Sequence, residues 1–131
     1  MAKGSCLCGK VTYEADQLGP GITKCHCRIC QKTSGSACGD YTTAPIDSFR
    51  WTSGEDLLTE YESSPGNFRH FCSVCGTHMP TAHPPLGIYF VQAGTLDGDE
   101  SLEEQAHIFL KSKAPWHEPR PGLNEFHEYP G

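Results

Sequence analysis

The chain has 131 residues, of which 37% are hydrophobic, with 14 Gly and 10 Pro. This length fits a single domain over residues 1–131, and the composition favours short strands and turns over packed helices. The formal net charge of −6, with Lys and Arg scattered along the chain, argues against nucleic-acid binding, which needs clustered basic residues. The sequence has no run of 18 apolar residues and no apolar stretch behind a basic start, so we expect no membrane span and no secretion signal, and a cytoplasmic protein.

The predicted elements are mainly strands. In residues 10–15, Val11, Tyr13 and Ala15 alternate with polar residues, which predicts a half-buried strand. Further strand-like segments, separated by Gly, Pro, Asp or Ser, lie at 39–43, 57–61, 68–71, 88–92 and 107–110. Helix is limited to a turn at 31–36 and one turn at 101–105, capped by Ser101. The sequence therefore predicts an all-β fold with little helix.

Seven of the eight cysteines fall into tight clusters. Spacings of one or two residues suit thiolates that hold one tetrahedral ion, whereas disulfides that close such short loops are strained and remove little chain entropy. The reduced thiols expected without a secretion signal also favour metal. The clustered cysteines are Cys6, Cys8, Cys25, Cys27, Cys30, Cys72 and Cys75, and Cys38 stands alone.

Two of the clusters share a glycine. Cys8 and Cys75 are each followed by Gly, which a metal knuckle needs if the next residue takes a positive φ and turns its amide toward the sulfur. Cys30 is followed by Gln31 and lacks this signature. We therefore pair Cys6 and Cys8 with Cys72 and Cys75 in a closed structural zinc site. Pairing of Cys6 and Cys8 with the triple cluster is the alternative.

Cys25, Cys27 and Cys30 remain as three thiolates at i, i+2 and i+5. Catalytic zinc commonly has three protein ligands and an exchangeable fourth position. Because three thiolates make zinc a weak Lewis acid toward water, the cluster favours activation of an incoming thiol, with these three cysteines as its catalytic residues. In the alternative, Cys38 or His26 supplies a fourth ligand and the site is closed.

These segments resemble the glutathione-dependent formaldehyde-activating enzyme family, which includes centromere protein V-like members. The resemblance rests on Gly4-Ser-Cys-Leu-Cys-Gly9, Cys25-His-Cys-Arg-Ile-Cys30, Arg69-His-Phe-Cys-Ser-Val-Cys-Gly76, Gly94-Thr-Leu-Asp97 and the segment from His107 to Trp116. It implies a small tent-like β-sheet domain with two zinc ions, one structural and one exchangeable, on the two cysteine sets paired above.

The resemblance also implies a carbon-sulfur lyase of S-(hydroxymethyl)glutathione synthase type, which joins glutathione and formaldehyde or runs the reverse. Because glutathione carries two carboxylates, we expect cationic and hydroxyl contacts from Arg28, Lys32, Ser34 and Arg69. The alternative is a non-catalytic, zinc-stabilised protein-binding module with both metal sites closed. A nucleic-acid or chromatin adaptor fits the breadth of the family but not the acidity of this chain.

Overall fold

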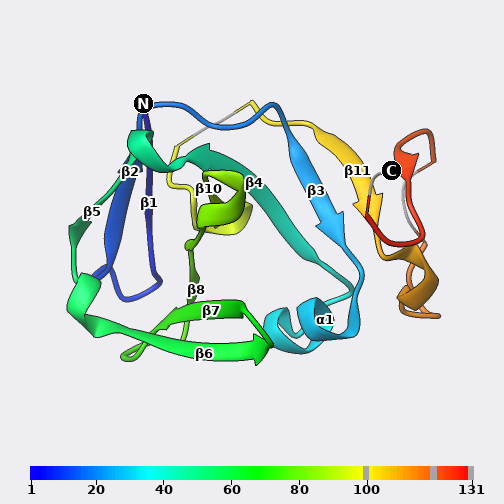
Figure 1. Ribbon diagram of the computed structural model, residues 1–131, viewed down its shortest axis with the longest axis horizontal. Helices are drawn as coiled ribbons and strands as arrows, with labels where there is room; N and C mark the ends of the chain where they lie inside the picture. Colours follow the sequence, from blue (N-terminus) through cyan, green and yellow to red (C-terminus); the bar gives the residue numbers. More distant parts are fainter. Residues whose placement is uncertain (99–100, 119–120, 130–131) are drawn as a thin grey trace. The chain divides into compact units, whose positions relative to one another are not determined.

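The structure, a computed structural model, describes residues 1–98, 101–118 and 121–129 (Figure 1). Most of its regular elements are strands, and α1 (Arg28–Ser34) is the α-helix within these residues. The strands are β1 (Ala2–Ser5), β2 (Thr12–Ala15), β3 (Ile22–Cys25), β4 (Gly39–Pro45), β5 (Phe49–Ser53), β6 (Leu58–Ser64), β7 (Asn67–Cys72), β8 (His78–Met79), β9 (Thr81–His83), β10 (Ile88–Gln92), β11 (Glu104–Ile108) and β12 (Asn124–Glu125). The predicted all-β class is confirmed. No helix in the described part of the chain is long and apolar enough to cross a membrane.

The chain divides into two compact units. The first unit comprises residues 1–19 and 42–101, and the second comprises residues 20–41 and 102–131. Strand β4 is the point at which the chain passes from the second unit to the first, since its residues 39–41 belong to one and 42–45 to the other. That residues 1–131 fold as one domain stays a prediction.

The first unit holds two three-stranded antiparallel sheets, ordered β1-β2-β5 and β6-β7-β8, and β9 pairs with β10. Its core includes Val11, Tyr13 and Met79 and takes in Cys6 and Cys72. Because the inward residues of β2 alternate with outward ones, the predicted pattern of residues 11, 13 and 15 is the buried face. The apolar core thus surrounds two of the clustered cysteines.

The second unit is built around β3. It pairs antiparallel with residues 39–41 of β4 and parallel with β11, which pairs in turn with β12. Helix α1 follows β3 after a short loop; the Cys27 side chain accepts a hydrogen bond from the amide of Cys30 at its start, and Gly35 ends it at φ 64°. The loop between strand and helix carries the triple-cysteine motif.

Several predicted boundaries differ from those observed. The strand at 88–92 coincides with β10, and those at 39–43, 57–61 and 68–71 overlap β4, β6 and β7. The helix expected from residue 31 starts at Arg28, because Cys27 acts as its cap.

Two predictions near β11 need correction. The helical turn predicted at 101–105 is wrong, since Glu104 begins β11 and pairs with Ile22 of β3. The strand predicted at 107–110 ends at Ile108, because Phe109 takes a left-handed φ of 57° and breaks the extended backbone.

Candidate functional site

The first cysteine group, Cys6, Cys8, Cys72 and Cys75, is assembled within the first unit. All four sulfurs lie within 4.8 Å of one another. The Sγ atoms of Cys6 and Cys8 are 3.5 Å apart, and those of Cys8 and Cys72 are 3.9 Å apart. Four sulfurs in a tetrahedron around zinc lie about 3.8 Å apart, whereas a disulfide needs about 2.0 Å. The spacing therefore fits a tetrahedral metal ion.

The two glycines of this group have the positive φ that was predicted from their position directly after a cysteine. Gly9 has a φ of 79° and Gly76 a φ of 80°. Their amides, however, donate to the carbonyl oxygens of Cys6 and Cys72 and not to sulfur. The sulfurs instead accept hydrogen bonds from other backbone amides, of Val11 to Cys6 (3.3 Å) and of Val74 to Cys72 (3.4 Å). The glycines close the turn, and neighbouring residues bond the sulfur.

The two more exposed thiols of this group differ in pKa. At Cys8 the amide of Lys10 lowers the pKa of the thiol, but desolvation and the neighbouring thiols outweigh it and raise that pKa to about 11, whereas local hydrogen bonds favour ionised sulfur at Cys75. The hydroxyl of Thr77 lies 3.2 Å from the Sγ of Cys75. This bond, followed by backbone amide bonds, lowers the pKa of Cys75 to about 5. A thiolate at neutral pH is the form that binds a metal ion.

The second cysteine group, Cys25, Cys27 and Cys30, is assembled within the second unit. Its three sulfurs lie within 4.8 Å of one another, and no fourth His, Cys, Asp or Glu among the described residues joins them. Cys25 and Cys30 are buried, while Cys27 is partly exposed. The group is therefore most accessible on the side of Cys27.

The second group also fits a bound cation. Hydrogen bonds with the thiols of Cys27 and Cys30, followed by burial and the charge of Cys30, raise the pKa of Cys25, so its ionisation needs positive charge as compensation. A divalent ion would supply that compensation. Both groups could thus hold a metal ion, and soft thiolate donors are those that zinc accepts.

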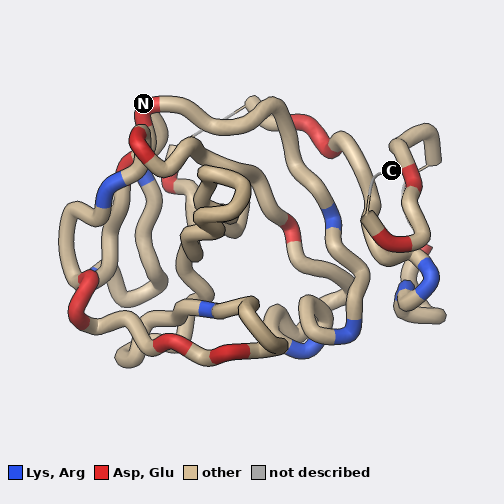
Figure 2. Tube along the Cα trace, in the orientation of Figure 1, with Lys and Arg blue, Asp and Glu red and all other residues tan. Residues whose placement is uncertain are grey.

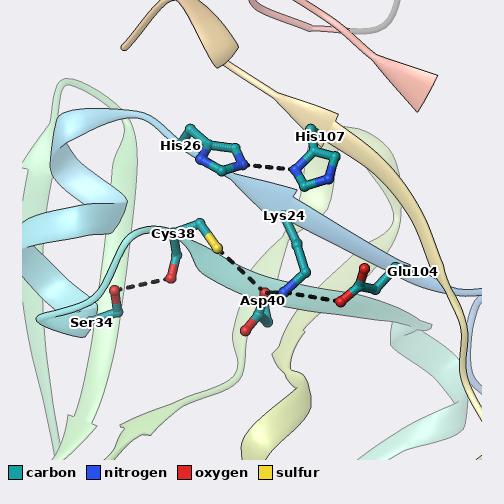
Figure 3. Close-up of polar contacts among 7 residues, drawn as sticks. All are labelled: Lys24, His26, Ser34, Cys38, Asp40, Glu104 and His107. Carbon is teal, nitrogen blue, oxygen red and sulfur yellow. Dashed lines mark hydrogen bonds and ion pairs between the residues drawn. The ribbon is translucent and has the colours of Figure 1, made fainter. Parts of the chain in front are cut away.

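The Cys38 side chain points toward Asp40, as Figure 3 shows. Its thiol donates to Oδ1 of Asp40 at 3.6 Å, the same oxygen that Lys24 binds at 2.8 Å. In β4, Gly39 pairs with Cys25 and Asp40 with Lys24, so Asp40 lies on the opposite face of the sheet from Cys25. Cys38, which bonds Asp40, is therefore separated by the sheet from the three cysteines of the second group.

His26 likewise stands outside the second group. Its Nε2 lies 2.8 Å from Nδ1 of His107, and both rings are buried (Figure 3). Burial, ahead of the charges of His107 and His117, lowers the pKa of His26 to about 4, so the ring is neutral at pH 7. His26 is a buried partner of His107 and not a residue of the surface.

Gln31 holds the loop of the second cysteine group in place, a role that the sequence did not reveal. Its buried side-chain amide donates to the carbonyl oxygens of His26 (2.7 Å) and Ser112 (2.8 Å). One side chain therefore ties the loop of the second group to the turn after β11. No local sequence pattern reveals this contact, because Ser112 lies 81 residues further along the chain than Gln31.

The predicted substrate contacts lie in both units. Arg28 and Lys32 are exposed on α1, which carries no acidic residue and is marked by basic residues in Figure 2. Ser34, also on α1, donates to the carbonyl oxygens of Cys30 (2.7 Å) and Cys38 (3.2 Å). Arg69 lies on β7 of the first unit, where its Nε donates to the hydroxyl of Ser63.

Cys38 is expected to resist alkylation in the folded protein at pH 8. Burial, followed by the charge of Asp40, raises the pKa of its thiol to about 11, so only about one thiol in a thousand is ionised at this pH. Mass spectrometry of peptides after iodoacetamide treatment measures this, with the same protein in guanidinium chloride as control. Equal labelling rates in the folded and unfolded chains would contradict the prediction.

Comparison with known proteins agrees with these features. The sequence model of a family described as glutathione-dependent formaldehyde-activating enzyme matches residues 1–112. A Rhodobacter sphaeroides protein of known crystal structure is similar in fold, with a TM-score of 0.64 and 23% identity over 79% of this chain and 99% of that one. Since the family match spans most of the sequence and includes both cysteine groups, the chain belongs to the glutathione-dependent formaldehyde-activating enzyme family.

Proposed function

We propose that the protein is a zinc-dependent carbon-sulfur lyase that joins glutathione and a small aldehyde such as formaldehyde, or cleaves their adduct. The observation that carries this proposal is the second cysteine group, three convergent thiols without a fourth ligand among the described residues. Family membership supports glutathione and formaldehyde as the substrates. We further propose that it works in the cytoplasm, where its eight free cysteines would stay reduced.

The two cysteine groups have different roles in this proposal. Cys6, Cys8, Cys72 and Cys75 would hold a structural zinc ion, because four donors complete its coordination. Cys25, Cys27 and Cys30 would hold an exchangeable zinc ion and leave its fourth position to the substrate. The partial exposure of Cys27 supports approach of the substrate from that side.

In the synthetic direction the glutathione sulfur bonds to the aldehyde carbon, the C=O double bond becomes single, and the thiol proton ends on the oxygen. A zinc ion in the second group would favour the deprotonated form of the incoming thiol. Arg28 and Lys32, exposed on α1 next to Cys27 and Cys30, would attract the two carboxylates of glutathione. Ser34 remains a proposed contact, and the contact expected of Arg69, which lies in the first unit, stays a prediction.

Titration of cobalt-substituted protein with glutathione tests the proposal. We expect the visible absorption of one of the two cobalt ions to shift and saturate, since a thiol enters an open position only at the second group. S-methylglutathione is the matched control ligand, because it keeps both carboxylates and lacks the thiol. An unchanged spectrum typical of two closed four-thiolate sites would reject the enzyme in favour of a binding module.

One observation at the first cysteine group favours the alternative function, a protein-binding module. Leu7 and Val74, inside the two knuckles, are 88% and 53% exposed. Exposed apolar side chains mark a protein-contact surface where they form one continuous patch, so these two residues are the candidates for such a surface. Loss of partner binding in a Leu7→Ser variant that still shows the glutathione-dependent shift would assign both roles to one chain.

A further inference from the structure

Tyr41 lies on the same face of the β3–β4 pair as Cys25. Thr23 pairs with Tyr41 and Cys25 with Gly39, while Asp40 turns to the other face with Lys24. Figure 3 shows that other face, occupied by Lys24 and Asp40. The hydroxyl of Tyr41 donates to the Sγ of Cys30 at 3.6 Å. The second cysteine group therefore accepts a hydrogen bond from a side chain outside its own loop and helix.

Gly39 provides the space for this bond. A Cβ atom at Gly39 would lie 2.5 Å from Cε2 and 2.7 Å from the hydroxyl oxygen of Tyr41. Gly39 is not among the glycines with positive φ, so its backbone does not itself require glycine. The ring of Tyr41 thus lies against the bare backbone of Gly39, and this approach lets the hydroxyl contact Cys30.

We infer that Tyr41 is a positioning residue that lowers the electron density on the Cys30 sulfur when a metal ion is bound by the second group. Three thiolates leave a divalent ion with one excess negative charge, and a donated O–H draws electron density away from the sulfur that accepts it. Burial strengthens the bond, since Cys30 is only 3% exposed. The inference rests on the metal site of the proposed function and not on its reaction.

This arrangement has a chemical consequence for an aldehyde-handling site. Formaldehyde is an electrophile that reacts with any electron-rich sulfur, including the metal ligands. Cys30 is protected by burial and by the Tyr41 hydroxyl, and a substrate thiol in the open position has neither protection. In the proposed lyase reaction, which the role of Tyr41 itself does not require, the hydrogen bond would direct the electrophile toward the substrate sulfur.

The test compares Tyr41→Phe with the wild type in cobalt-substituted full-length protein. Phe keeps the ring and loses the hydroxyl, so the sulfur-to-cobalt charge-transfer band of the second group is expected to move to longer wavelength. Alkylation of Cys30 by iodoacetamide, followed by peptide mass spectrometry, is expected to rise about fivefold, the equivalent of one ordinary hydrogen bond. Tyr129→Phe is the matched control, because Tyr129 is exposed and packs against Phe109.

Gly39→Ala provides a second variant that retains the Tyr41 hydroxyl. The added Cβ displaces the ring, so the band and the alkylation rate are expected to change as in Tyr41→Phe. Unchanged values in both variants, or absence of cobalt from the second group, would overturn the inference. If Tyr41→Phe shifts the band while glutathione leaves the wild-type spectrum unchanged, the role of Tyr41 stands and the proposed lyase function fails.

Discussion

Replacement of Cys72 by Ser is expected to leave the first unit unfolded. The side chain is fully buried and packs in the apolar core with Val11 and Tyr13. A structural zinc ion contributes about 10–16 kcal/mol to folding in small zinc domains. A whole domain is stable by only about 5–15 kcal/mol, so loss of the ion exceeds the margin. Far-UV circular dichroism and thermal denaturation measure the loss.

Ser73→Ala is the matched control for this variant. Ser73 is the next residue along the chain and is exposed, so its replacement is expected to leave the melting temperature unchanged. A cooperative melting transition of the Cys72→Ser protein near the wild-type temperature would contradict a structural role for the first cysteine group.

Replacement of Cys27 by Ser is expected to have the opposite outcome, a folded protein without activity. Cys27 is the N-cap of α1, where its side chain accepts a hydrogen bond from the amide of Cys30. Serine is among the preferred N-cap residues, so the helix keeps its cap. The second group loses one of three thiolates, and catalysis of glutathione addition to formaldehyde is expected to fall by more than the roughly 10–100-fold that loss of an outer-shell partner of a metal ligand costs. Exchange NMR, corrected for the uncatalysed reaction, measures the rate.

Cys38→Ser is the matched control for Cys27→Ser, since Cys38 bonds Asp40 on the other face of the sheet. We expect this variant to retain two metal ions and full activity. If Cys27→Ser unfolds to the same extent as Cys72→Ser, the two cysteine groups do not have the separate catalytic and structural roles proposed for them. If Cys38→Ser loses a metal ion, the second group is closed.

The local parts of the fold and site were predictable from the sequence. Alternation identified the buried face of residues 11–15, and the turns at Gly9 and Gly76 followed from glycine next to cysteine. These signals are local, because each depends on the conformation of a few consecutive residues. The same glycine argument paired the four cysteines that the structure brings together in the first group.

The remaining features depend on contacts between distant residues. Strand β3 has four residues and gives little periodic signal, and its parallel partner β11 lies about 80 residues further along the chain. Ser101 suggested a helix cap, but pairing of Glu104 with Ile22 overrides that preference. The role of Tyr41 depends on the register of Cys25 with Gly39, which no local pattern reveals.

The register of β3 and β4 also bears on how such a site could arise in evolution. Cys38 immediately precedes β4, and Asp40 and Cys25 lie on opposite faces because side chains alternate along a strand. A shift of one residue in the pairing of β4 with β3 would reverse which side chains accompany Cys25. A fourth sulfur would then be available to three that already converge. In the proposed function, the register of two short strands thus decides whether the second group keeps a position for an exchangeable ligand or becomes a closed four-thiolate site.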